Sequence, residues 1–442
     1  MPKDKINFLI LGAVSEILYL SLFLVEPARR IIHDYGLVLG VNSILTKLSV
    51  IILATFLLYA LACRIVDFNK VPLRLIIGFG MVLTITTSLL WPTSSKDLFS
   101  YISQARITSV YNQNPYSTSY SNFSNDAFYP ILKNDWSWFP VVYGPVFTIL
   151  GIIITKIAGN NLLLNVYLFK LIFLIFNIAN IYLILKLTAN KKSVFLYAFN
   201  PLVIHELSIN SHTESLLIMF LLISLLIIKH GKSTVHFLVS LLSLTLSVLI
   251  KYSTFVIVPF YLVYIFKKFK KRRELFYFAS LAAILISATT AVFFMSFIDN
   301  INLLGNLVDV AQAFTFHTSL GITIILFILY KLGLSRPYEA SLIISRIIFF
   351  ITTPLIFIGY LKLELTKRRT KDVGSFKQLI LFLLLTLVVY YATFFNWFFA
   401  WYMTPLIAIL TLYQAMSKNA FLVFYTNLIT IYGIFLTMVI AR

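Results

Sequence analysis

The stretch INFLILGAVSEILYLSLFL, from Ile6 to Leu24, is an apolar run with a single carboxylate, and runs of this kind recur along all 442 residues. A helix needs about 20 apolar residues to cross the hydrocarbon core of a bilayer, and this run has that length. A membrane β-barrel would instead show strands of about ten residues in which polar and apolar side chains alternate. The sequence therefore predicts an all-α polytopic membrane protein.

Composition agrees with that class and narrows the partners. The chain is 60% hydrophobic and only 12% charged, with a mean hydropathy of +0.91. A net charge of +20 would suggest nucleic acid in a soluble chain. Here Lys and Arg gather in short loops between apolar segments, where they set orientation and meet anionic lipid. We therefore expect membrane lipid, and no nucleic acid, as a partner. The lone Cys63 excludes an internal disulfide and a cysteine-based metal cluster.

Two basic clusters orient the chain. KKFKKRR (Lys267 to Arg273) and KLELTKRRTK (Lys362 to Lys371) lie between apolar segments and are expected in the cytoplasm. The long polar loop from Pro92 to Pro140 carries few basic residues and is expected outside. A retained first helix and this orientation give about thirteen spans. They are expected near 6–24, 43–63, 73–91, 162–186, 193–209, 213–229, 236–250, 252–266, 275–297, 340–361, 376–394, 398–415 and 420–440.

Two further apolar stretches, 141–158 and 318–331, would break the inside–outside alternation if both crossed the bilayer. We therefore expect them to be re-entrant or surface-lying helices on the outer side. No linker, repeat or soluble domain separates the spans. The sequence predicts one membrane domain over residues 1–442, with an outer catalytic loop at about 92–160.

Asp97 follows the third span by a few residues, in the stretch SSKDLFSYISQAR. A carboxylate at the membrane surface can serve as a general base for a hydroxyl of a lipid-carried substrate. SSKD before LFSYI also fits a helix N-cap, and the two roles can coexist. Tyr101 lies one helical turn further along and Arg106 follows in the same stretch, which together suggest a polar helix face.

Four ionisable residues crowd the junction of two spans in NPLVIHELSINSHTES: His205, Glu206, His212 and Glu214. This composition suggests a metal site, but the spacing is not a strong metal motif. Hydrogen bonding to a polar substrate is the alternative, and satisfied interfacial residues are the simplest interpretation.

Lys251 interrupts an apolar run that suits two short spans meeting at the outer face. It either snorkels for solvation or holds a phosphate as a compact cation. Near the C-terminus, NWFFAWYMTP places Trp397 and Trp401 at the outer end of a span. An aromatic belt explains them by default, although sugar rings also stack on such faces.

Taken in order, these pieces resemble the integral-membrane glycosyltransferases of the C superfamily, most closely the polyprenol-phosphate-mannose-dependent mannosyltransferases. The resemblance covers most of the chain, and its most specific part is DLFSY, then NPY, then YGP. The residues that carry it are Asp97, Tyr101, Arg106, NPY (Asn114 to Tyr116), Trp136 or Trp138, YGP (Tyr143 to Pro145), NPLVIHE with SHTES, Lys251 and the Trp-rich late span. One departure is His212-Thr213-Glu214, where those relatives often read His-Asn-Asp.

The resemblance implies an inverting transfer of one sugar, expected to be mannose, from a polyprenyl-phosphate donor to a hydroxyl of a glycan or glycolipid acceptor. The reaction would take place at the outer face of the cell membrane, with no cofactor and with a divalent metal optional. Asp97 would be the base, while Lys251 and Arg106 would hold the phosphate. The substrate-binding residues are expected to be Tyr101, Arg106, Asn114, Tyr116, Tyr143, His205, His212, Glu214, Lys251, Trp397 and Trp401.

A transporter or flippase of a lipid-linked saccharide is the alternative from another class, since it also needs many spans and basic loops. Transporters more often consist of two corresponding halves, and no internal repeat is visible here. Among enzymes, a ligase that moves a whole oligosaccharide is a further alternative.

Overall fold

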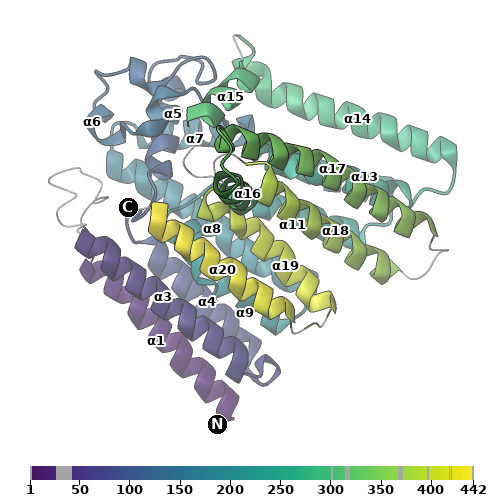
Figure 1. Cartoon of the computed structure of the whole chain (residues 1–442), viewed down its shortest axis with the longest axis horizontal. Helices are drawn as coiled ribbons and strands as arrows, with labels where there is room; N and C mark the ends of the chain where they lie inside the picture. The colour runs from purple at the N-terminus through teal and green to yellow at the C-terminus, as the bar shows by residue number, and fades with distance from the viewer. Residues whose placement is uncertain are drawn as a thin grey trace.

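The computed structural model describes residues 2–25, 42–299, 302–313, 319–366, 372–395, 398–417, 419 and 421–440. Throughout these ranges the regular structure is helical, and no strand occurs in them (Figure 1). The predicted all-α class is therefore confirmed.

Seven helices in the described part of the chain are long and apolar enough to cross a membrane. They are α1 (Lys3–Val25), α3 (Asn42–Ile65), α8 (Leu162–Thr188), α14 (Arg272–Phe294), α17 (Pro337–Thr366), α18 (Asp372–Thr393) and α20 (Phe421–Ile440). These apolar runs form helices because a helix satisfies its own backbone hydrogen bonds in lipid. The chain is therefore a multi-pass membrane protein.

Other apolar segments form shorter helices, so not all of the thirteen predicted spans are full-length helices. The shorter helices include α4 (Leu73–Ser88), α7 (Pro145–Ala158), α12 (Thr234–Ile250), α13 (Val258–Phe266), α16 (Leu320–Lys331) and α19 (Thr404–Ser417). The stretches 141–158 and 318–331 contain α7 and α16, of 14 and 12 residues, which are too short to span alone. Their placement at the outer surface stays a prediction.

The predicted span at 193–209 is wrong as a single helix. The chain forms α9 (Lys191–Ala198), stops, and restarts as α10 (Pro201–Val203), which continues into the π-helical segment η4 (Ile204–Ile209). The restart has a local cause: the side chain of Asn200 accepts hydrogen bonds from the amides of Leu202 and Val203, and Pro201 occupies the first turn. After η4 the chain bends by 114° into α11 (Glu214–His230).

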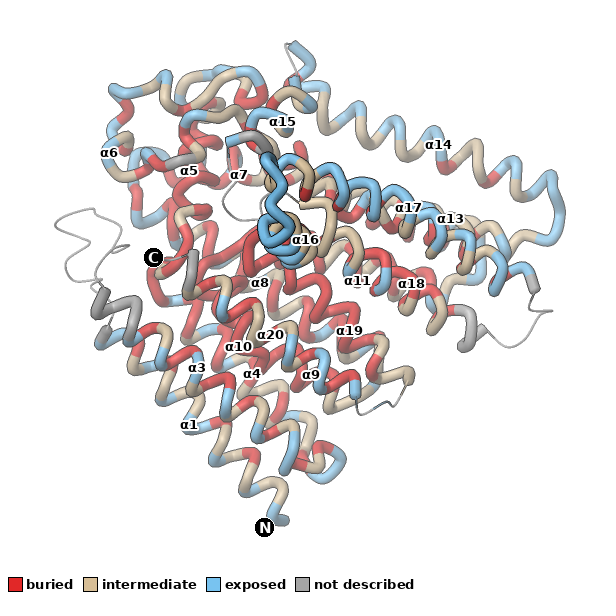
Figure 2. Tube along the Cα trace, in the orientation of Figure 1, coloured by how far each residue is buried: buried red, intermediate tan, exposed pale blue. Residues whose placement is uncertain are grey.

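The core lies around α8, α9 and α19, where Figure 2 shows most of the buried residues. On α14, by contrast, only Phe278 and Ala282 are buried, as expected for a helix that faces lipid. The buried face of α8 includes the polar residues Asn165, Lys170, Asn177 and Asn180. Polar side chains inside a membrane helix need partners, and Lys170 and Asn177 find them at η4, whereas Asn180 donates to the carbonyl of Ser215 and Asn165 to that of Gly159.

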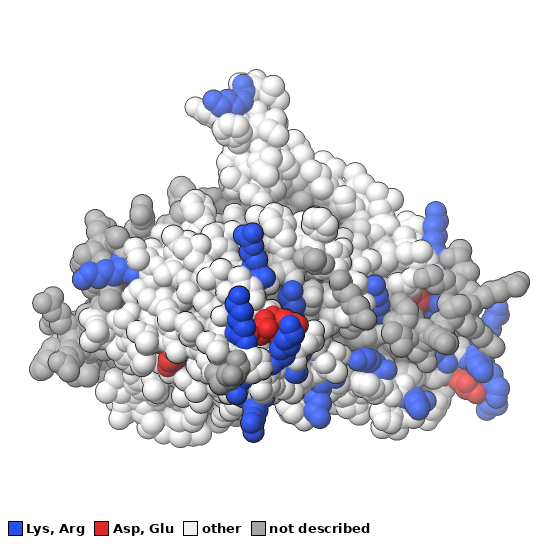
Figure 3. Space-filling model, turned by 90° about the horizontal axis from the view of Figure 1, so that it is seen from below, with Lys and Arg blue, Asp and Glu red and all other residues white. Residues whose placement is uncertain are grey.

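The two ends of the molecule differ. In Figure 1, α5 (Asp97–Ser109), α6 (Tyr129–Leu132) and α15 (Leu303–Ala313) lie at the top, and the N-terminus lies at the bottom. The face seen from below carries many Lys and Arg side chains and few acidic ones (Figure 3). Short 3₁₀ turns join the helices: η1 (Phe68–Lys70), η2 (Tyr120–Asn122), η3 (Asp135–Trp138), η5 (Tyr252–Ile257), η6 (Met295–Phe297) and η7 (Ala400–Met403).

Candidate active site

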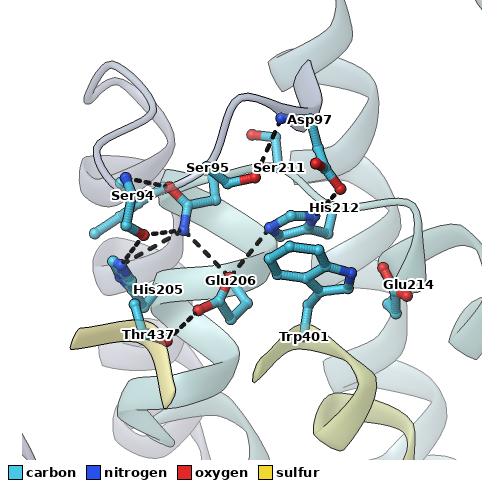
Figure 4. Close-up of polar contacts among 12 residues, drawn as sticks. Ser94, Ser95, Asp97, His205, Glu206, Ser211, His212, Glu214, Trp401 and Thr437 are labelled. Atoms are coloured by element: carbon cyan, nitrogen blue, oxygen red, sulfur yellow. Dashed lines mark hydrogen bonds and ion pairs between the residues drawn. The ribbon is translucent and has the colours of Figure 1, made fainter. Parts of the chain in front are cut away.

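The turn at residues 210–213, between η4 and α11, carries an imidazole held between two carboxylates (Figure 4). His212 Nδ1 lies 3.3 Å from Asp97 Oδ2, and His212 Nε2 lies 3.1 Å from Glu206 Oε2. Trp401, from η7, stacks on the ring with a centroid distance of 3.9 Å and an interplanar angle of 17°. All four side chains are buried. Contacts on both edges and one face therefore fix the position of His212.

Further hydrogen bonds hold the far side of this group. Glu206 Oε1 accepts a hydrogen bond from Thr437 Oγ1 of α20 at 2.7 Å, and Glu206 Oε2 accepts one from Asn210 Nδ2 at 3.2 Å. Asn210 also donates to Ser94 Oγ at 2.8 Å, and Ser94 Oγ lies 3.0 Å from His205 Nε2. The network thus joins the loop before α5 to η4 and to the C-terminal helix.

Lys170 explains why the helix can end abruptly at this point. Its Nζ, buried on α8, donates to the carbonyl oxygens of Ser208 at 3.1 Å and Ile209 at 2.7 Å, and to Ser211 Oγ at 3.1 Å. Carbonyls at a helix C-terminus lack intrahelical partners and attract a cation. Ser211 then takes a left-handed backbone conformation, with φ +61°, that turns the chain toward α11.

The charges of the site favour a protonated His212, which lies outside the membrane-spanning helices in the 210–213 turn. Burial alone would lower the pKa of this imidazole, but its contacts with Asp97 and Glu206 raise the pKa to about 9. At neutral pH the ring is therefore an imidazolium between two carboxylates. It can hold Asp97 in place electrostatically.

Asp97 is the first residue of α5, but its side chain does not cap that helix. The N-cap residue is Lys96, which makes no side-chain capping hydrogen bond, and the amide of Asp97 donates to Ser95 Oγ at 3.1 Å. The N-cap interpretation of Asp97 is therefore wrong. Its carboxylate instead turns toward His212, as Figure 4 shows.

Lys251 lies at the predicted break, immediately after α12 and before η5. Its Nζ forms an ion pair with Glu214 Oε1 and lies 4.0 Å from the centre of the Tyr402 ring. The side chain of Lys251 remains 14% exposed, while that of Glu214 is buried. The structure thus places a cation, a carboxylate and an aromatic face beside the 210–213 turn.

Arg106 lies elsewhere, because nine residues separate it from Asp97. Nine residues are about two and a half helical turns, which puts the two side chains on opposite faces of α5. Arg106 forms a buried ion pair with Asp126 at 2.8 Å and lies 4.2 Å from the centre of the Phe128 ring. Its NH2 group also donates to Asn160 Oδ1 at 3.1 Å. The predicted polar face shared with Asp97 is therefore wrong, and we do not propose Arg106 as a phosphate ligand.

The NPY and YGP motifs hold the outer loop against the helices. Asn114 Nδ2 donates to the carbonyl of Phe297 at 2.9 Å, and the Tyr116 hydroxyl donates to the carbonyl of Tyr143 at 2.9 Å. The amide of Gly144 donates to the carbonyl of Ile250 at 2.9 Å. A Cβ at Gly144 would lie 1.9 Å from the carbonyl oxygen of Leu249, so this position needs glycine. These motifs thus fix the backbone next to Lys251.

Tyr101 and Tyr143 pack edge to face with a centroid distance of 5.3 Å, and Lys251 Nζ lies 6.0 Å from the Tyr143 ring. They form an aromatic wall beside the Lys251–Glu214 pair. Trp401 is buried against His212 and is no part of an exposed aromatic belt. Trp397 lies outside the described residues.

The sequence comparison identifies the family. Residues 21–267, more than half of the chain, match the profile described as alpha-(1->6)-mannopyranosyltransferase, N-terminal domain. The chain belongs to this mannosyltransferase family. The expected resemblance to a mannosyltransferase family is thereby confirmed.

Comparisons with curated proteins and with solved structures give less information. No curated protein matches this chain significantly. Among solved structures, it is similar to the crystal structure of the Archaeoglobus fulgidus oligosaccharyltransferase in complex with zinc and sulfate. The TM-score is 0.42 at 16% identity, with 83% of this chain covered. The match covers 52% of the oligosaccharyltransferase, so it extends over about half the length of that protein.

Within the described ranges of this mannosyltransferase family member, no group of three or more His, Cys, Asp and Glu side chains is arranged to hold a metal ion. The ring nitrogens of His212 each face one carboxylate, and Glu214 faces Lys251. The metal interpretation of the four-residue cluster therefore gains no support from the geometry.

The sequence interpretation missed several residues of the site. Lys170 had a signal, since a lone Lys in an apolar span indicates a buried role. Glu206 was recognised only as part of a crowded junction, because a contact with His212 depends on the bend between them. Asn210, Ser94 and Thr437 had no sequence signal, since they meet Glu206 or its neighbours only in the folded chain.

Proposed function

We propose that the protein transfers one mannose from a polyprenyl-phosphate donor to a hydroxyl of a glycan or glycolipid acceptor at the outer membrane face, with inversion at the anomeric carbon. Family membership supports mannosyl transfer. The observation that carries the residue assignments is the grouping of Asp97, His212, Glu214 and Lys251 around the 210–213 turn.

In this proposal Asp97 is the general base. Its Oδ2 pairs with His212, and we assign Oδ1 to the acceptor hydroxyl. The acceptor oxygen forms a bond to the anomeric carbon as its proton moves to Asp97. The bond between that carbon and the phosphate oxygen breaks, and the polyprenyl phosphate leaves with the electron pair. Attack opposite the leaving group inverts the anomeric centre.

Lys251 would stabilise the departing phosphate. A compact ammonium group suits this role, and Lys251 Nζ lies 4.0 Å from the centre of the Tyr402 ring and 6.0 Å from that of the Tyr143 ring. Glu214 already pairs with Lys251, so the donor phosphate must share or replace that contact. Glu214 would then be free to accept hydrogen bonds from sugar hydroxyls. A donor that arrives in the membrane explains why a sugar-transferring enzyme needs no nucleotide-binding domain.

The test uses membranes that contain the protein, a radiolabelled polyprenyl-phosphate mannose and a glycolipid acceptor extract. Asp97→Asn keeps the shape of the side chain but removes its ability to accept a proton. We expect a loss of transfer of about 10²-fold or more, with an unchanged amount of folded protein. The matched control is Asp67→Asn, at a half-exposed carboxylate in the α3–α4 turn, which should retain full transfer.

Three results would contradict the proposal. Near-normal transfer by a folded Asp97→Asn protein would remove Asp97 as the base. Movement of the labelled lipid across vesicle membranes, with no glycosidic product, would favour the transporter alternative. Transfer from a nucleotide sugar but not from the lipid phosphate would contradict the donor assignment.

A further inference from the structure

Glu206 reaches Asp97 through His212, which lies between the two carboxylates. Its side chain is 1% exposed, and it lies on the opposite edge of the imidazole from Asp97. The two carboxylates therefore face opposite edges of one ring.

Three groups hold Glu206, two from the 210–213 turn and one from α20. His212 and Asn210 meet its Oε2 at 3.1 and 3.2 Å, and Thr437 donates to its Oε1 at 2.7 Å. A buried carboxylate is costly unless it is paired and hydrogen-bonded, and this one has both kinds of partner. Since a neutral glutamine would avoid much of that cost, the negative charge itself calls for a function.

We propose that Glu206 is a positioning residue for mannosyl transfer, which acts through His212 to hold a charged imidazole against the base Asp97. This inference rests on the proposed function and adds a carboxylate that does not contact the substrate. With Glu206 in place, the imidazolium keeps Asp97 Oδ2 fixed, so that Oδ1 meets the acceptor hydroxyl in one orientation. Without it, the ring loses one of the two charges that favour its protonated state.

The groups around His212 define how the site responds to pH. Asp97 faces it from α5, Glu206 and His205 lie on η4, and the Glu214–Lys251 pair lies beside the turn, while Lys170 of α8 holds the η4 carbonyls. Asp97 and Glu206 are the two carboxylates paired directly with the ring. An opposite charge at this distance typically shifts a pKa by about 1 to 3 units. Loss of Glu206 should therefore lower the pKa of His212 from about 9.

The first measurement is the pH profile of transfer. In Glu206→Gln we expect kcat to fall about 10-fold or more, with little change in KM for the donor, and the alkaline limb of the kcat profile to move at least about one pH unit lower. Glu206→Asp, which keeps the charge, should recover part of the rate and of the alkaline limb. Glu364→Gln removes a different buried carboxylate, paired with Lys267, and should leave the profile unchanged.

A double-mutant cycle separates this role from a structural one. If Glu206 acts through His212, adding Glu206→Gln to a His212→Gln protein should cause little further loss, because the coupling partner is already absent. Rate losses that multiply in the double variant would overturn the inference. So would a Glu206→Gln protein with lower stability but a wild-type pH profile per folded molecule.

Thermal unfolding of the purified protein tests the same pairing without any substrate. A His whose folded pKa is raised from 6.5 to about 9 stabilises the fold fully at pH values below 6.5, and this stabilisation is lost as pH rises through about 9. In Glu206→Gln this stabilisation should be lost at a lower pH, and in His212→Gln the pH-dependent change in melting temperature should be absent. If the melting profile of Glu206→Gln matches wild type, the pairing is refuted, whether or not the mannose donor proves correct.

Discussion

Two cation–carboxylate pairs, Arg106–Asp126 and Lys251–Glu214, differ in how completely they are enclosed. Arg106 and Asp126 are both buried, and Arg106 Nε, Asn160 and Tyr111 complete their hydrogen bonds. Lys251 and Glu214 form a simpler pair, in which the Lys251 side chain remains 14% exposed and its ammonium group lies near two tyrosine rings. A fully enclosed pair holds the fold, whereas a partly exposed one can exchange its partner for a ligand. Both cations were phosphate candidates in the sequence, and this difference separates them.

The largest effect on stability is expected at the enclosed pair. Arg106→Met leaves Asp126 buried without its partner, which typically costs about 3–5 kcal/mol of unfolding free energy. Hydrogen bonds from Arg106 and Tyr111 otherwise offset the effect of burial and hold the pKa of Asp126 below its ordinary value. We expect a large fall in melting temperature, with normal transfer per folded molecule.

The double variant Arg106→Met with Asp126→Asn is the control for that prediction. It removes both charges and should recover part of the lost stability. A singly substituted protein that melts normally but loses donor turnover would instead place Arg106 in the substrate site.

The Lys251–Glu214 pair should show a loss of transfer that exceeds its loss of stability. Lys251→Met keeps the apolar stem but leaves the buried Glu214 without its partner, so some fall in melting temperature is expected and transfer is compared per folded molecule. We expect kcat/KM for the donor to fall about 10-fold or more, and Lys251→Arg to retain part of the activity. Steady-state transfer at varied donor concentration measures this. Lys267→Met, at a comparable Lys–Glu pair between α13 and α17, is the matched control. Unchanged donor kinetics in folded Lys251→Met would remove Lys251 from the site.

The smallest perturbation tests which side of the membrane both pairs face. Ser124 and Lys271 are exposed, in the outer loop and in a basic loop respectively. In a Cys63→Ala background, a cysteine at Ser124 should react with an impermeant thiol reagent in intact cells, and one at Lys271 should react only after lysis. Neither change should affect transfer. The reverse labelling pattern would put the reaction on the cytoplasmic side.

The sequence predicted the fold class well, because apolar runs of spanning length leave few alternatives in a bilayer. It failed at 193–209, where the apolar pattern continues across a helix restart. Two Asn-Pro pairs show the difference. The one at Asn114 lies in the polar loop that was expected outside the spans, whereas the one at Asn200 lies among apolar residues and was read as part of a span.

The site was predictable as a set of residues but not as a set of contacts. Asp97, His212, Glu214 and Lys251 were all identified from the chemistry of their side chains. Their pairing depends on the 114° bend and on Trp401, which comes from the far end of the chain. Arg106 shows the same limit. It lies nine positions after Asp97 in α5, so its side chain points to the opposite face of the helix, and its polar character alone did not reveal this.

The π-helical form of η4 makes the length of this segment as constrained as its composition. Such a turn holds one residue more than an α-helical turn, and it is found frequently where function requires it. Deleting one residue between Ile204 and Ile209 would rotate the following chain by about 100° and carry His212 away from both carboxylates. Related sequences that align here without gaps can therefore share this geometry even where their side chains differ, whereas a single-residue gap would mark a different site.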